Sequence, residues 1–194
     1  MKIGYFQFLP EFLKIKNNFD KVEMILNANK AKIKGLELLV FPEYFLSGPL
    51  KIEYLSDYEK KISTEEIKNY FSKISEKFPK TTFVMGSVLL KINENYFNAT
   101  LVCKNGKIIA EYRKKALIYN ERYVCESDDN VSIFKVNNLD IGIAICWDLI
   151  LPEIFRKYAE KIDLLILPSF WGIAGNALQA RYSFSLEKKY YTAL

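Results

Sequence analysis

An apolar run that ends at a thiol constrains this chain more than any other feature. Residues 141–145 have the length and composition of one buried strand, and Cys146 follows directly. Pro152 then opens a helix, since proline is favoured at the first helical position. The carboxyl end of a strand in an α/β sheet is where ligands bind, and helix N-termini favour a thiolate. We therefore interpret Cys146 as a site residue; the alternative is a small core residue, as free cysteines commonly are.

The sequence contains no histidine. A nucleophilic cysteine would therefore need a carboxylate or a lysine as its partner instead of an imidazole. Two such groups also follow apolar strands. Residues 36–41 lead to Glu43, and residues 107–112 lead to Lys114, whose neighbour Lys115 is the competing candidate.

Length and composition bound the class of protein. Half of the 194 residues are hydrophobic, which suffices for one core, so we expect a single domain over residues 1–194. The net charge of +5 comes from basic residues interspersed with nearly as many acids, which argues against nucleic-acid binding. Charges interrupt the amino-terminal stretch and no apolar run approaches membrane-spanning length. We therefore expect a cytoplasmic protein with neither nucleic-acid nor membrane partners.

The three cysteines do not form a metal-binding pattern. Cys103, Cys125 and Cys146 lack ligand spacing, and a zinc site without histidine would need all of them plus a carboxylate. Cys103 lies in the middle of a predicted strand and is interpreted as core. We expect reduced thiols, no metal and no organic cofactor.

Hydrophobic periodicity and turn signals predict the order of elements. The predicted helices are 17–33, 63–78, 151–160 and 176–188, and the predicted strands are 2–8, 36–41, 82–90, 96–104, 107–113, 131–136, 139–145 and 163–167. Residues 42–62 are expected to be irregular. A capping box begins at Ser63, and Asn105-Gly106 is typical of a tight hairpin. This pattern predicts an α/β (α+β) protein with a mixed sheet covered by helices.

Glutamate, lysine and cysteine in this chain order, each after a strand, resemble the nitrilase superfamily of carbon–nitrogen hydrolases. The matching segments are Phe41-Pro42-Glu43, Tyr112-Arg113-Lys114 and Cys146-Trp147-Asp148, supported by residues 2–7, 96–99 and 167–171. The resemblance implies a nitrilase-like α-β-β-α sandwich. Members usually continue for several further strands, so we expect the domain to be shortened at its carboxyl end.

The resemblance also implies the chemistry. Cys146 would attack a small amide or nitrile and form a thioester. Glu43 would be the general base, with a pKa raised by its apolar neighbours. Lys114 would stabilise the oxyanion together with the backbone N–H of Trp147.

Other assignments leave alternatives open. Glu121 is the candidate second acid, although Glu126 competes with it and a solvated loop acid is equally consistent. Asp148 is expected to cap the helix after Cys146 rather than to take part in chemistry. Four aromatic residues are expected to line the pocket or else to belong to the core: Tyr44, Trp147, Phe170 and Trp171.

The prediction from sequence is an amidase-like carbon–nitrogen hydrolase. Ile150 stands where many family members have arginine, which favours an uncharged acyl group, and Ala116 stands where many have histidine. The rival hypothesis is a truncated, non-catalytic homologue that serves as a binding or assembly partner. A redox-sensing thiol protein is a third. Missing strands would expose apolar surface, so we expect a homodimer or larger homo-oligomer through helices 151–160 and 176–188.

Overall fold

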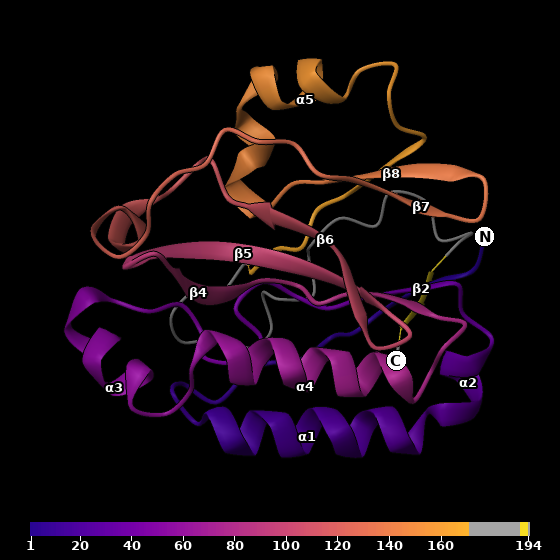
Figure 1. Cartoon of the computed structure of the whole chain (residues 1–194), viewed down its shortest axis with the longest axis horizontal. Helices are drawn as coiled ribbons and strands as arrows, with labels where there is room; N and C mark the ends of the chain where they lie inside the picture. The colour runs from indigo at the N-terminus through magenta and orange to yellow at the C-terminus, as the bar shows by residue number, and fades with distance from the viewer. Residues whose placement is uncertain (171–190, 194) are drawn as a thin grey trace.

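The structure, a computed structural model, describes residues 1–170 and 191–193. Its elements form four layers (Figure 1). Helices α1 (Ile15–Ala28) and α4 (Thr64–Glu76) cover the outer face of a seven-stranded sheet. A three-stranded sheet lies on the other face, and α5 (Pro152–Tyr158) covers it from outside. The predicted α-β-β-α sandwich is confirmed.

The larger sheet has the strand order β10-β1-β2-β3-β5-β4, with β6 paired to β5. Its strands are β1 (Ile3–Tyr5), β2 (Leu38–Val40), β3 (Thr82–Val84), β4 (Val88–Ile92), β5 (Asn95–Lys104), β6 (Lys107–Arg113) and β10 (Tyr191–Ala193). Strands β10, β1, β2 and β3 are parallel, and β5 runs antiparallel to β3. The smaller sheet consists of β7 (Ile133–Val136), β8 (Leu139–Ile143) and β9 (Leu164–Ile166).

Local sequence signals explain why several elements begin and end where they do. The Ser63 hydroxyl accepts a hydrogen bond from the Glu66 amide, and the Glu66 carboxylate accepts one from the Ser63 amide, so the predicted capping box begins α4. Asn105 and Gly106 both have positive φ and join β5 to β6 with Lys104 opposite Lys107. Both predictions are confirmed.

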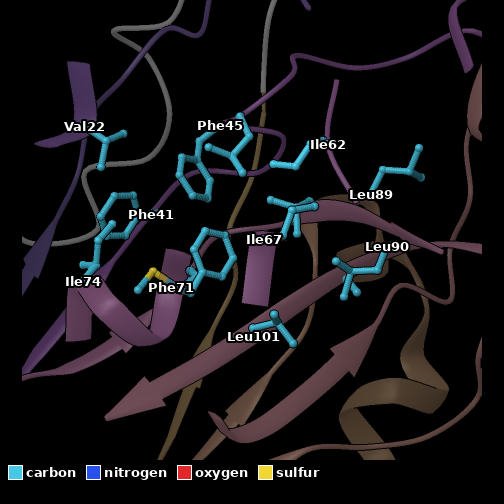
Figure 2. Close-up of a cluster of buried hydrophobic side chains, with 14 of the residues drawn as sticks. Val22, Phe41, Phe45, Ile62, Ile67, Phe71, Ile74, Leu89, Leu90 and Leu101 are labelled. Carbon is cyan, nitrogen blue, oxygen red and sulfur yellow. The ribbon is translucent and has the colours of Figure 1, made fainter. Parts of the chain in front are cut away.

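The core beneath the larger sheet is formed mainly by α4, β2, β4 and β5. Ile67, Phe71 and Ile74 line one face of α4, as the periodicity predicts, and are at most 1% exposed. Figure 2 shows these side chains gathered with Phe41 and Phe45 from the segment after β2. This packing fixes the segment that carries Glu43.

Several predicted boundaries are wrong. The helix predicted over 17–33 is two helices, α1 and α2 (Lys30–Lys34), which meet at Asn29, where φ is −107° and ψ is 16° and the backbone departs from helical geometry. The stretch predicted to be irregular contains η1 (Ile52–Tyr54) and α3 (Leu55–Glu59). Buried Tyr58 anchors α3 by donating to the Leu89 carbonyl at 2.7 Å, a tertiary contact that periodicity does not reveal.

The two ends of the described chain meet in the larger sheet. Residues 191–193 form β10, which pairs in parallel with β1. The predicted helix 176–188 lies outside the described residues, and self-association stays a prediction. Within the described part of the chain, no helix is long and apolar enough to cross a membrane.

The strand predicted over 82–90 is divided at Gly86. Gly86 has φ +47°, and a Cβ atom there would lie 1.9 Å from the Pro42 carbonyl oxygen. The neighbouring Ser87 amide donates to the same oxygen at 3.3 Å. The turn between β3 and β4 therefore packs directly against the backbone that precedes Glu43, and only glycine fits at this approach.

We expect Gly86→Ala to destabilise the protein by about 2 kcal/mol or more, because a left-handed alanine and a backbone clash both add cost. Gly35→Ala is the control, since Gly35 has φ −88° and a Cβ atom there would lie 3.3 Å from the nearest atom. Urea unfolding of both variants measures the difference. Equal midpoints for the two would show that the turn relaxes around the added methyl group.

Candidate active site

Three strand exits bring the candidate catalytic side chains together. Glu43 follows β2, Lys114 directly follows β6, and Cys146 follows β8. All three are buried, with exposed fractions of 2%, 1% and 5%. Backbone bonds fix each position: the Lys114 amide donates to the Asn98 carbonyl, and the Cys146 amide donates to the Pro168 carbonyl, both at 2.9 Å.

The Lys114 ammonium lies between two carboxylates. Its Nζ donates to Glu43 Oε1 at 2.8 Å and to both oxygens of Glu121 at 2.9 Å. The Asn98 amide group donates to the same Glu43 oxygen at 3.0 Å and to Glu121 Oε1 at 2.9 Å. The Tyr44 hydroxyl completes the network by donating to Glu121 at 2.6 Å. These contacts place one cation and two anions in a buried, hydrogen-bonded cluster.

The thiol of Cys146 adjoins this cluster through Glu43. Burial raises the pKa of the Cys146 thiol, the Glu43 carboxylate raises it further through its charge and hydrogen bonding, and the backbone of Phe170 lowers it. The Phe170 amide also donates to Glu43 Oε2 at 2.9 Å. Glu43 is therefore the group that joins the sulfur to the ammonium.

Burial and charge set the protonation of the site. Burial raises the pKa of Glu43, although the Lys114 charge opposes the shift. Burial and the Glu43 charge raise the pKa of Cys146 to about 12. Burial disfavours the charge on Lys114, but the two carboxylates outweigh it and raise the pKa of this ammonium. At neutral pH the Cys146 thiol therefore keeps its proton, and the lysine remains charged.

The structure separates the competing candidates. Glu121 is 7% exposed and belongs to the cluster, so it is not a solvated loop acid, whereas Glu126 is exposed. Lys115 points elsewhere and pairs with Asp129 and, at 3.8 Å, with Glu153.

The four aromatic residues take different positions. Tyr44 is 4% exposed and contributes its hydroxyl to Glu121, and Phe170 contributes its backbone amide to Glu43. Trp147 is half-buried beside Cys146. Trp171 lies outside the described residues.

Asn98 is the cluster member that sequence reasoning missed. It lies on β5, is fully buried, and is the side chain that bridges Glu43 and Glu121 from the side of the larger sheet. The available signal was an amide in an otherwise apolar stretch, since buried polar groups require partners. Within residues 1–170 and 191–193, no three metal-ligating side chains are arranged to hold an ion.

The other two thiols have different surroundings. Cys103 lies in the core on β5, as predicted, and burial raises its pKa to about 12. Cys125 is also buried and has a pKa raised to about 12, first by burial and then by the charge of Glu121. Because all three thiols share this value, acidity does not distinguish Cys146; its contact with the Glu43 carboxylate does.

Known proteins resemble this chain in sequence and in fold. A nitrilase from Pyrococcus abyssi is 26% identical over 198 residues, which cover 99% of this chain and 73% of that protein. The glutamine-dependent NAD(+) synthetase of Thermotoga maritima is 27% identical over 150 residues, which cover 70% of this chain and 24% of the synthetase. The solved structure of an amidase from Nesterenkonia sp. has a TM-score of 0.74, with 18% identity over 92% of this chain and 68% of its own.

These likenesses differ in what they establish. The amidase structure shows the fold alone at this identity, and the chain spans only about a quarter of the synthetase. The family itself rests on a broader match, because the carbon-nitrogen hydrolase family model covers residues 2–184. The chain belongs to the carbon-nitrogen hydrolase family.

Proposed function

We propose that this protein hydrolyses the carbon–nitrogen bond of a small amide through a cysteine thioester. Cys146 is the nucleophile, Glu43 the general base and Lys114 the stabilising cation. The observation that carries the proposal is a single buried carboxylate, Glu43, in contact with both the thiol and the ammonium. Solved structures of the Nesterenkonia amidase, which carry adducts of acrylamide and fluoroacetamide at its active-site cysteine, lend support.

The first step transfers the thiol proton to Glu43 while Sγ attacks the carbonyl carbon. The carbonyl electron pair moves to oxygen, which becomes the oxyanion of a tetrahedral intermediate. A preformed thiolate is not required, because a thiol of pKa about 12 is neutral at rest and loses its proton only during attack. The raised pKa of Glu43 favours this transfer, since it brings the base closer in proton affinity to its donor.

Lys114 supplies positive charge where the oxyanion forms. Its ammonium donates hydrogen bonds to both carboxylate oxygens of Glu121. One of these bonds can be replaced by a bond to the oxyanion, while the other keeps the lysine in position. Glu121 is thus a positioning residue for Lys114. In a water-excluded site, charge fixed in advance stabilises the intermediate more strongly than it would in water.

The second half of the reaction returns the site to its starting state. The carbon–nitrogen bond breaks as Glu43 passes its proton to the leaving nitrogen, and the carbonyl re-forms as a thioester. Water then attacks the thioester, giving one proton to Glu43. The carbon–sulfur bond breaks, the acid departs, and sulfur recovers a proton.

The surroundings of the cluster favour an uncharged acyl group. Glu43, Glu121 and Lys114 together carry one net negative charge when all are ionised, which disfavours a substrate carboxylate near the reacting carbon. Ile150, on the turn after Cys146, is 55% exposed and offers apolar surface where many family members have arginine. A neutral, small aliphatic or aromatic amide is therefore the substrate class that we propose.

Selective alkylation tests the nucleophile. We expect limiting iodoacetamide to label Cys146 before Cys103 or Cys125, because only Cys146 has the Glu43 base in contact. Peptide mapping measures the order of labelling. The preference should vanish in Glu43→Gln, and an inert Cys146 beside a labelled Cys125 in the folded wild type would contradict the assignment.

Replacement of the base tests the reaction. We expect Glu43→Gln to lower turnover by about 10²-fold or more, because glutamine cannot carry the proton. Ammonia release from a panel of small neutral amides measures turnover, and intact-mass spectrometry detects the acyl enzyme. Glu126→Gln, in an exposed loop position, is the control and should match the wild type. No wild-type turnover together with no covalent adduct would instead favour a non-catalytic binding or assembly role.

The adjacent lysines provide a matched pair. Lys114→Ala should abolish activity and cost about 3–5 kcal/mol of stability, because two buried carboxylates lose their cation. Lys115→Ala removes ion pairs at a side chain 23% exposed and should cost about 1 kcal/mol or less. Turnover and urea midpoints measured in parallel give the ranking. The reverse ranking would transfer the catalytic role to Lys115.

A further inference from the structure

Asp148 connects the two chain segments that carry Cys146 and Lys114. Its carboxyl group is fully buried, and its Oδ1 accepts hydrogen bonds from the amides of Lys115 at 3.1 Å and Ala116 at 2.7 Å. Its Oδ2 accepts from the Ile145 amide at 2.8 Å and from the Tyr112 hydroxyl at 2.8 Å. One oxygen thus bonds only the lysine segment, and the other bonds both Tyr112 on β6 and the residue before the cysteine.

The cysteine turn needs such support because its backbone is strained. Cys146 has φ +45°, a left-handed conformation that costs a residue with a side chain free energy. The turn is closed by the Asp148 amide, which donates to the Ile145 carbonyl at 2.9 Å, and by the return bond from the Ile145 amide to Asp148 Oδ2. Asp148 therefore caps the turn, as the sequence indicates, but three of the four hydrogen bonds of its carboxyl group come from a segment more than thirty residues away.

We propose that Asp148 is a positioning residue that sets the distance between the Cys146 thiol and the Glu43–Lys114 pair. The inference rests on the proposed roles of these residues. The lysine segment extends from the larger sheet and the cysteine turn from the smaller one. The Asp148 carboxyl group ties them together directly at the reacting groups. Errors of about 1 Å in such a distance cost about 10²-fold in rate.

We call the four hydrogen bonds of the Asp148 carboxyl group the Asp148 clamp. Asp148→Asn tests this clamp because the substitution removes the bond to the cysteine turn and can keep the bonds to the lysine segment. Asparagine can keep its oxygen on the Lys115 and Ala116 amides, but its NH₂ group then faces the Ile145 amide, and two donors cannot bond. In the opposite orientation the NH₂ group of asparagine would face the amides of both Lys115 and Ala116, so two hydrogen bonds would be lost in place of one. The cysteine turn should therefore loosen while the lysine segment stays bonded.

We expect Asp148→Asn to lower kcat by about 10²-fold with KM within about twofold, since the thiol is misplaced but the substrate surface is retained. Alkylation of Cys146 by iodoacetamide should fall to the rate of Cys125. Ile154→Ala is the matched control, because it destabilises the core around Ala144 and Tyr158 without touching the clamp. Ile154→Ala should keep the wild-type kcat and Cys146 alkylation rate below its unfolding temperature.

Two results would overturn the clamp: wild-type kcat and alkylation in Asp148→Asn, or losses that merely follow stability and are equal in Ile154→Ala. Hydrogen exchange of the wild-type protein decides the matter if the variant does not fold. Ile145 and Ala116 amides exchanging as slowly as those of β8 support the clamp, and exchange at exposed-loop rates contradicts it. If the wild-type protein shows no turnover, the proposed function is refuted. The alkylation and hydrogen-exchange measurements would still test whether Asp148 positions Cys146.

Discussion

The ion cluster around Lys114 is the interaction on which the site depends. An ammonium 1% exposed, with carboxylates on either side, is costly to desolvate and is stabilised only when every partner is present. Glu43 and Glu121 supply the charges, and Asn98 and Tyr44 supply further donors. Removing Lys114 would leave two carboxylates without their cation in the interior. The cluster therefore couples catalytic geometry to folding.

This coupling explains why the surrounding backbone is so specialised. Glu43 lies on a turn packed against Gly86, whose lack of a Cβ atom permits the approach, and Tyr44 beside it has φ +54°. Cys146 also has positive φ. Such conformations persist only where surrounding contacts determine them, and the contacts here come from the same polar groups that form the site. The strained backbone conformations and the hydrogen bonds of the site therefore occur at the same strand exits.

The sequence predicts the parts of this arrangement that depend on local pattern. Apolar runs that end before Glu43, Lys114 and Cys146 reveal the three strand exits, because buried strands are read from hydrophobicity alone. The bridging role of Asn98 could not be predicted in this way, since its partner Glu43 is 55 residues distant along the chain. The break at Asn29 was missed for another reason: an apolar stripe continues across it, while only the backbone of one residue departs from helical geometry.

The absence of histidine from the sequence gives the cluster its chemical character. A protonated imidazole would form an ion pair with a thiolate and stabilise it before substrate binds, because cationic partners lower the pKa of a thiol. Here burial and the charge of the neighbouring Glu43 raise the pKa of Cys146 and keep the proton in place. In the reaction that we propose, proton transfer from sulfur to Glu43 leaves the net charge of the buried cluster unchanged, so no counterion has to enter. The fixed positive charge of Lys114 then acts on the oxyanion, at the stage of the reaction where negative charge has moved from the cluster to the substrate.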